Sequence, residues 1–265
     1  MSSPNAGQRS VTRWCRVELD GRPRIGTVGD GKIQLFDGTL FEAPAPTDET
    51  IDVDAAVWLP PVVPRQYLGL WNNFRERQRI ERTTTPDYPL FFAKLGDTLA
   101  AHEQRIRSPK TYQGIVKFEA ELGIVIGQRS FELDRANVDD AIFGYTCVND
   151  ITAATPLFAN PEFPQWCRAK SFPGFGPVGP TIATGIDPLQ LTVRAILDGK
   201  IKQDYPVSDM IFSPQEIVWH LSQEMTLFPG DVIACGTSVG AEPMHSGQTI
   251  AVEIPGVGLL RNYMA

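Results

Sequence analysis

Residues 118–127 read FEAELGIVIG, and this stretch decides the fold that the sequence predicts. Apolar side chains occupy every second position from Phe118 to Ile126, and the positions between them begin with Glu119 and Glu121. A period of two residues is typical of a β-strand whose two faces differ. The pattern therefore predicts a strand that carries both glutamate side chains on one face.

Further strands are predicted on both sides of this stretch. Residues 191–205 contain Asp198-Gly199 at their centre, which favours a type I′ hairpin because glycine tolerates a positive φ. Ser213 and Glu216 have the spacing of a capping box and predict the start of a helix. The other predicted elements are a short helix over 134–143 and strands over 145–152, 232–235, 248–254 and 257–262. The sequence therefore predicts a strand-rich α+β fold rather than repeated βαβ units.

The chain is predicted to divide at a cluster of prolines. Residues 11–58 consist of short apolar or β-branched runs separated by glycine-containing turns, which indicates a small β-rich domain. Three prolines at 60–64 indicate a stiff connector, because proline fixes φ and removes a backbone donor. We therefore expect an N-terminal domain at 1–64 and a larger domain at 65–265.

Composition excludes several classes of protein. The 265 residues are 42% hydrophobic and 21% charged, which is typical of a globular protein with a substantial core. The formal net charge of −7 repels a nucleic-acid backbone, so no nucleic-acid partner is expected. No uninterrupted apolar stretch of about 18 residues occurs, and residues 1–10 are polar; we expect neither a membrane partner nor secretion, but a cytoplasmic protein. The four cysteines are isolated in the sequence and are expected to be reduced.

A third carboxylate makes the two glutamates a candidate metal site. Asp150 lies in the next predicted strand, within an apolar run where a lone carboxylate is costly to bury. Neighbouring carboxylates repel one another unless a cation lies between them, and Mg²⁺, Mn²⁺ and Ca²⁺ prefer oxygen ligands. Glu119, Glu121 and Asp150 therefore predict a site with three oxygen ligands. The alternative is a solvated strand face without a function.

Two other segments offer groups that can bind a substrate. Lys170 lies in a run over 168–180 that is rich in glycine and proline and is expected to be an irregular loop. Its ammonium can hold a substrate carboxylate or stabilise an enolate, or it is an ordinary surface lysine. Gly236 and Thr237 end the strand predicted over 232–235 and offer a backbone N–H and a hydroxyl, or they form a simple turn.

Basic residues and a histidine supply further candidates. Arg75, Arg79 and Arg82 fall at i, i+4 and i+7 of a predicted helix. They predict a basic lid over an anionic substrate, with a solvated helix face as the alternative. His102 precedes Glu103 and is a candidate general base because an imidazole titrates near neutral pH; the alternative is a histidine with only a structural role.

Five ordered blocks resemble the fumarylacetoacetate hydrolase (FAH) family, over a region from about Gly69 to Asn262. They are residues 118–127 (FEAELGIVIG), 144–150 (GYTCVND), 170–172 (KSF) with 179–180 (GP), 228–233 (FPGDVI), and 236–237 (GT). The resemblance implies a mixed β-roll catalytic domain, usually in a homodimer. It also implies Mg²⁺ or Mn²⁺ held by Glu119, Glu121 and Asp150.

The resemblance also implies roles for individual residues near the metal. Lys170 and Thr237 match family residues that contact the substrate, and Lys94 matches the lysine of the family's F-x-K segment. We therefore expect Lys170 to be catalytic and Lys94, Gly236 and Thr237 to bind the substrate.

The chain departs from the family pattern at the lid and beside Asp150. Arg75 stands where the family's lid usually has a histidine, and Ala154 and Leu157 stand where the family often carries arginine and glutamine. Glu76 and His102 are the candidate replacements for the general base, and Arg75 is a candidate partner for a substrate carboxylate.

The resemblance implies an enzyme of 2-oxo and β-diketo acids. The first hypothesis is a divalent-metal-dependent hydrolase that cleaves a C–C bond of an acylpyruvate or a fumarylacetoacetate-like acid through a metal-chelated enolate, in the catabolism of aromatic compounds. The second is a decarboxylase or keto–enol isomerase, because these reactions need no activated water. The third is a non-catalytic relative that binds a metal or metabolite.

Overall fold

The N-terminal part of the chain forms a small antiparallel sheet. The computed structural model describes residues 10–265. The sheet's strands are β1 (Thr12–Leu19), β2 (Arg22–Gly29), β3 (Lys32–Asp37) and β4 (Ala45–Asp52), with β5 (Val57–Trp58) paired to β1. Cys15, Val17, Ile33 and Leu35 form its buried core. The predicted β-rich character of this part is confirmed, and the boundary at residue 64 stays a prediction.

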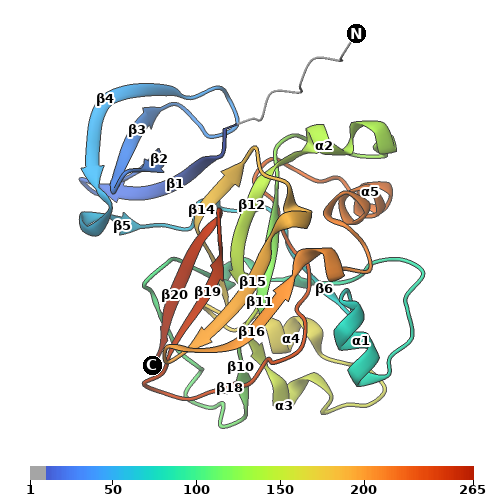
Figure 1. The fold of residues 1–265 in the computed structure, drawn as a ribbon. Coiled ribbons are helices and arrows are strands. Elements are labelled where there is room, and N and C mark those ends of the chain that lie inside the picture. Colours follow the sequence, from blue (N-terminus) through green and yellow to red (C-terminus); the bar gives the residue numbers. More distant parts are fainter. Residues whose placement is uncertain (1–9) are drawn as a thin grey trace.

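This sheet continues into the central sheet through hydrogen bonds between β1 and β14 (Figure 1). The central strands, in spatial order, are β14 (Gly176–Thr184), β12 (Ile142–Asn149), β11 (Ala120–Ile126), β17 (Val232–Ala234), β6 (Tyr67–Trp71) and β7 (Leu90–Lys94), with β8 (Leu99–Ala100) paired to β14. Both faces of β11 are buried: Leu122 and Ile124 belong to the main core, and Val125 belongs to a second cluster behind the sheet.

A second sheet packs on one face of the central sheet (Figure 1). Its strands are β16 (Lys200–Pro206), β15 (Thr192–Leu197), β19 (Thr249–Ile254), β20 (Gly258–Met264) and β9 (Arg105–Ile106). A three-stranded sheet consists of β13 (Thr152–Ala153), β10 (Val116–Lys117) and β18 (Pro243–Met244). Val193, Val252 and Leu260 share the main core with Leu122, so the two larger sheets form one apolar interior.

Short helices connect the strands. They are α1 (Arg75–Glu81), α2 (Val138–Ala141), α3 (Ala154–Leu157), α4 (Trp166–Lys170) and α5 (Pro214–Glu224), with single 3-10 turns at Val53–Ala55, Gly96–Thr98, Arg135–Asn137, Pro188–Gln190 and Val207–Asp209. The predicted capping box at α5 is present, because Ser213 Oγ accepts from the Glu216 N–H and the Glu216 side chain accepts from the Ser213 N–H. Within residues 10–265, no helix combines the length and apolar character that crossing a membrane requires.

The strand-rich fold is confirmed, and several local predictions need correction. The hairpin turn at Asp198-Gly199 has the predicted positive φ at both residues. The helix predicted over 134–143 is a 3-10 turn followed by the short α2, and the strand predicted over 145–152 begins at Ile142.

The irregular loop predicted over 168–180 is confined to residues 171–175. Lys170 ends helix α4, and β14 begins at Gly176 despite its prolines. A register shift between β12 and β14 explains how the strand contains these prolines. Cys147 pairs with Gly179, and the neighbouring Thr146 pairs with Ile182. The bulge therefore accommodates Pro180 without a missing ladder bond.

Candidate active site

Three carboxylates meet where β11 begins and β12 ends. Glu119 lies directly before β11, Glu121 is its second residue, and Asp150 follows β12. The two strands are antiparallel neighbours, with Ala120 paired to Asn149, so the start of one lies beside the end of the other. One carboxylate oxygen from each acid lies within 4.8 Å of the others. Glu119 and Glu121 both line the same cavity, as the strand period predicts.

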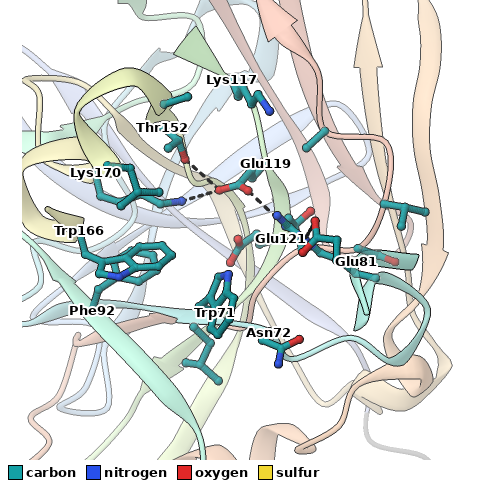
Figure 2. A pocket seen from close by; sticks show the side chains of 18 of the residues that line it. Trp71, Asn72, Glu81, Phe92, Lys117, Glu119, Glu121, Thr152, Trp166 and Lys170 are labelled. Carbon is teal, nitrogen blue, oxygen red and sulfur yellow. Dashed lines mark hydrogen bonds and ion pairs between the residues drawn. The ribbon is translucent and has the colours of Figure 1, made fainter. Parts of the chain in front are cut away.

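Three cationic side chains contact this cluster. Lys94 Nζ on β7 lies 2.6 Å from Asp150 Oδ1, and both side chains are buried. Lys170 Nζ on α4 donates to both Glu119 and Asp150. Figure 2 shows the contact with Glu119. Arg77 on α1 lies 3.3 Å from Glu119 Oε1 and also bonds Glu81 at 2.9 Å. The carboxylates are therefore held by groups from three other elements.

The surroundings move the pKa values of these groups in different directions. Burial alone raises the pKa of Glu119, but Lys170 and Arg77 outweigh it and lower this pKa to about 2. Burial alone lowers the pKa of Lys170, but the carboxylates of Asp150 and Glu119 outweigh it and raise this pKa above its ordinary value. Burial, Asp150 and Glu119 all raise the pKa of Glu121 well above its usual range. The surroundings therefore favour the charged form of Glu119 and disfavour the charged form of Glu121.

The donor set fits a hard divalent cation. Hard cations prefer carboxylate oxygens, and one oxygen from each of the three acids lies within 4.8 Å of the others. Burial and the neighbouring carboxylates raise the pKa of Glu121, and a cation bound beside it would stabilise its charged form. Glu119, Glu121 and Asp150 are the residues that would hold the ion.

Gly236 and Thr237 follow β17 and brace the cluster from the other side. The Gly236 N–H donates to Glu121 Oε2 at 2.8 Å, so this N–H is already engaged. Gly236 has a φ of +89°, and a Cβ there would lie 3.3 Å from the carbonyl oxygen of Leu70. Thr237 lines the cavity, and its hydroxyl donates to the Ala120 carbonyl at 2.8 Å. A glycine is therefore required where the chain turns toward Glu121.

Gln203 supports the carboxylate cluster, and the sequence did not predict this role. It is buried on β16, accepts from the Ala120 N–H at 3.0 Å and donates to the Thr237 hydroxyl at 2.8 Å. Gln203 therefore connects the strand that carries Glu121 to the loop that carries Thr237. No signal in the sequence distinguishes it, since a glutamine in an amphipathic strand is normally solvent-facing.

Glu119 and Glu121 form the floor of a cavity of about 540 Å³, and Asp150 is buried beside them. The wall includes apolar and aromatic residues from β6, β7 and the α3–α4 region, namely Leu70, Trp71, Phe92, Ala154, Leu157, Phe158 and Trp166. Helix α1 contributes Arg77, Ile80 and Glu81. These three lie at i, i+3 and i+4 and share one helix face.

The predicted basic lid does not face the cavity. Arg75 bonds the carbonyls of Met210 and Ile211, and Glu76 pairs with Arg79 on the exposed side of α1. Neither Arg75 nor Glu76 lines the cavity. The helix ends before Arg82, so the predicted helical spacing of the arginines does not hold. Glu81 was overlooked, although its spacing of four residues from Arg77 was a usable signal.

His102 also lies away from the cavity. Its Nδ1 accepts from the Arg261 N–H at 3.0 Å, and its ring packs edge-on against Trp58 of β5. Burial lowers the pKa of His102, Glu103 opposes this shift, and Arg261 adds to it. The structure therefore gives His102 a structural contact between the N-terminal part and β20 instead of a place beside the carboxylates.

Comparison with known sequences gives two matching family descriptions. Residues 64–265 match "Fumarylacetoacetate (FAA) hydrolase C-terminal", and residues 12–61 match "Rv2993c-like, N-terminal". The chain is 36% identical over 233 residues to an uncharacterized protein of Archaeoglobus fulgidus, covering 88% of each chain. It is also 36% identical over 198 residues to a 4-hydroxyphenylacetate degradation bifunctional isomerase/decarboxylase of Salmonella dublin, covering 74% of this chain and 45% of that protein.

A solved structure has the same fold over almost the whole chain. The 2-hydroxyhepta-2,4-diene-1,7-dioate isomerase of Mycobacterium marinum superposes with a TM-score of 0.86 at 30% identity. The superposition covers 96% of this chain and 98% of that one.

Proposed function

Because the chain belongs to the fumarylacetoacetate hydrolase family, whose members are enzymes, we propose that it is a divalent-metal-dependent enzyme acting on a small 2-oxo acid through an enolate. The observation that carries this proposal is the convergence of three carboxylates, with one oxygen of each within 4.8 Å of the others. Two of them, Glu119 and Glu121, line the cavity. A bound Mg²⁺ or Mn²⁺ supplies positive charge that stabilises negative charge on the 2-oxo acid oxygens.

The protein's own residues position the substrate and move protons. Lys170 stays protonated between Glu119 and Asp150 and adds a second positive charge beside the reacting end of the substrate. The Thr237 hydroxyl lines the cavity and can turn toward a carboxylate oxygen. The apolar and aromatic residues of the cavity wall would contact the part of the substrate beyond the 2-oxo acid.

We propose isomerisation or decarboxylation as the reaction. Both reactions need a stabilised enolate and a proton transfer but no activated water. Within residues 10–265, no histidine lines the cavity, which favours reactions without a histidine base. The names of the relatives from Salmonella dublin and Mycobacterium marinum, an isomerase/decarboxylase and an isomerase, agree with this choice.

Hydrolysis of a C–C bond is the second candidate. Glu81 lines the cavity and presents a carboxylate that can accept a proton from water. The choice between Mg²⁺ and Mn²⁺ and the homodimer stay predictions.

Thermal unfolding with metal and oxalate tests the proposed site. A ligand that binds the folded state raises the melting temperature by mass action. Mg²⁺ or Mn²⁺ should stabilise the wild type, and oxalate, which resembles the enolate of a 2-oxo acid, should stabilise it further. Glu121→Gln should lose both effects, whereas the control Glu76→Gln should keep them. No stabilisation of the wild type by either ligand would contradict the metal site.

Product analysis then separates the reactions. Oxaloacetate yields CO₂ and pyruvate if the protein is a decarboxylase, and phenylpyruvate equilibrates faster with its enol if it is an isomerase. Acetylpyruvate and water yield acetate and pyruvate if it is a hydrolase. Metal and oxalate binding without any turnover would favour a non-catalytic binding protein.

A further inference from the structure

An aromatic wall made of Trp71, Phe92, Phe158 and Trp166 lines part of the cavity. Figure 2 shows Trp71, Phe92 and Trp166 of this wall. The rings of Phe92 and Trp166 are stacked, with centroids 5.3 Å apart and an interplanar angle of 12°. Trp71 and Phe158 contact the same Trp166 ring at centroid distances of 6.1 and 6.2 Å. Trp166 is therefore held by three aromatic neighbours and presents a fixed apolar surface.

The aromatic wall begins next to the carboxylate cluster. Trp166 and Lys170 are the first and last residues of α4, and a spacing of four places both side chains on one helix face. Lys170 Nζ lies 4.9 Å from the Phe92 ring centroid while it bonds Glu119 and Asp150. Trp166 is thus one helical turn from Lys170. A substrate whose 2-oxo acid end binds at the carboxylate floor would place its next atoms against the aromatic wall.

In the described part of the chain, no cationic side chain that lines the cavity is placed to pair with a second substrate carboxylate at the aromatic wall. Lys170 and Arg77 are both paired with Glu119. Lys117 on β10 also lines the cavity, but Figure 2 shows it on the other side of Glu119 from Trp166. A carboxylate against Trp166 would lose its hydration without gaining a partner there.

We infer that the substrate carries an uncharged, flat apolar group at its far end, an aryl or conjugated alkenyl group that lies against Trp166. This inference rests on the proposed function, because it takes the 2-oxo acid end as bound at the carboxylate floor. It distinguishes this chain from an enzyme of dicarboxylic 2-oxo acids, in which the far end is an anion.

Binding measured by calorimetry on the Mn²⁺-loaded protein tests the inference with three ligands. Oxalate has only the chelating end, phenylpyruvate adds an aryl group, and 2-oxoglutarate adds a carboxylate. We expect phenylpyruvate to bind the wild type at least about tenfold more tightly than 2-oxoglutarate, since loss of a well-placed apolar contact typically changes affinity by one to two orders of magnitude.

Variants of two tryptophans identify the contact. Trp166→Ala should weaken phenylpyruvate about tenfold or more and leave oxalate unchanged, and Trp166→Phe should restore most of the affinity. The matched control is Trp219→Ala, because Trp219 on α5 packs on Arg135 and does not line the cavity. Unchanged oxalate binding also shows that each variant is folded.

Different failures have different meanings. Tighter binding of 2-oxoglutarate than phenylpyruvate, or equal phenylpyruvate binding by the wild type and Trp166→Ala, would overturn the apolar far end while leaving the proposed function intact. Failure of oxalate to bind the Mn²⁺-treated wild type would overturn the proposed function and this inference with it.

Discussion

Lys94 Nζ lies 2.6 Å from Asp150 Oδ1, and both side chains are almost completely shielded from solvent. Each member of this ion pair compensates the buried charge of the other. Burial is also the largest influence on the pKa of Lys94, which is lowered even though Asp150 opposes the shift. Lys94, on the edge strand β7, therefore holds the Asp150 carboxylate in place.

Lys94→Met should lower the free energy of unfolding by about 3–5 kcal/mol, because removal of one partner leaves a buried charge uncompensated. Urea denaturation measures this change. Lys32→Met is the matched control, because the Lys32–Asp52 pair is 2.7 Å long but exposed and should contribute less than about 1 kcal/mol. An equal decrease in the free energy of unfolding in both variants would show that burial does not strengthen the Lys94–Asp150 pair.

Gly236→Ala should weaken metal binding as well as stability. The positive φ is unfavourable for alanine by about 1 kcal/mol, and its Cβ would press on the Leu70 carbonyl beside the N–H that bonds Glu121. Gly31→Ala has a similar positive φ with nothing within 4 Å of the added Cβ, so it should show only the backbone effect. Mn²⁺ titration of both variants separates the two effects, and equal Mn²⁺ affinities would argue against a supporting role for Gly236.

Gln203→Leu should lower the free energy of unfolding by about 1–3 kcal/mol, because it leaves the buried Ala120 N–H without its acceptor. We also expect weaker Mn²⁺ binding, since Ala120 lies between two of the proposed ligands. Gln113→Leu is the control, as its bond to the Lys110 carbonyl is exposed. Wild-type Mn²⁺ affinity in Gln203→Leu would show that Gln203 supports the fold alone.

His102 should make stability depend on pH in the mildly acidic range. Burial lowers its folded-state pKa below the unfolded value of about 6.5, so the unfolded chain binds more protons between these two values. The stability of the wild type should therefore fall as pH decreases below about 6.5. Melting temperatures between pH 5 and pH 8 should show a smaller decrease in His102→Gln. Turnover near pH 8 should be retained in this variant, and its loss would return His102 to the catalytic candidates.

The carboxylate cluster was predictable because its members come from two neighbouring strands. The two-residue period placed Glu119 and Glu121 on one face, and the cost of burying a lone carboxylate pointed to Asp150. Lys94 and Lys170 are distant in sequence from this cluster. Lys170 was a candidate because of the glycine- and proline-rich run around it, whereas Lys94 became one only through the family resemblance.

The orientation of α1 was not predictable. Its seven residues include one large apolar side chain, Ile80, and none of them is buried. Sequence periodicity therefore could not decide whether Arg75 or Arg77 faces the cavity. The aromatic wall was missed for a related reason, since Trp71 and Trp166 belong to segments that meet only in the folded chain.

The closure of long loops has a consequence for folding kinetics. Lys94 and Asp150 are 56 positions apart, and Gly236 and Glu121 are 115 apart. Such non-local contacts form late, because the entropy of closing the intervening loops must be overcome first. A cation that needs the finished cluster cannot accelerate refolding; it should instead slow unfolding, so that metal prolongs the lifetime of the native protein without changing how fast it forms.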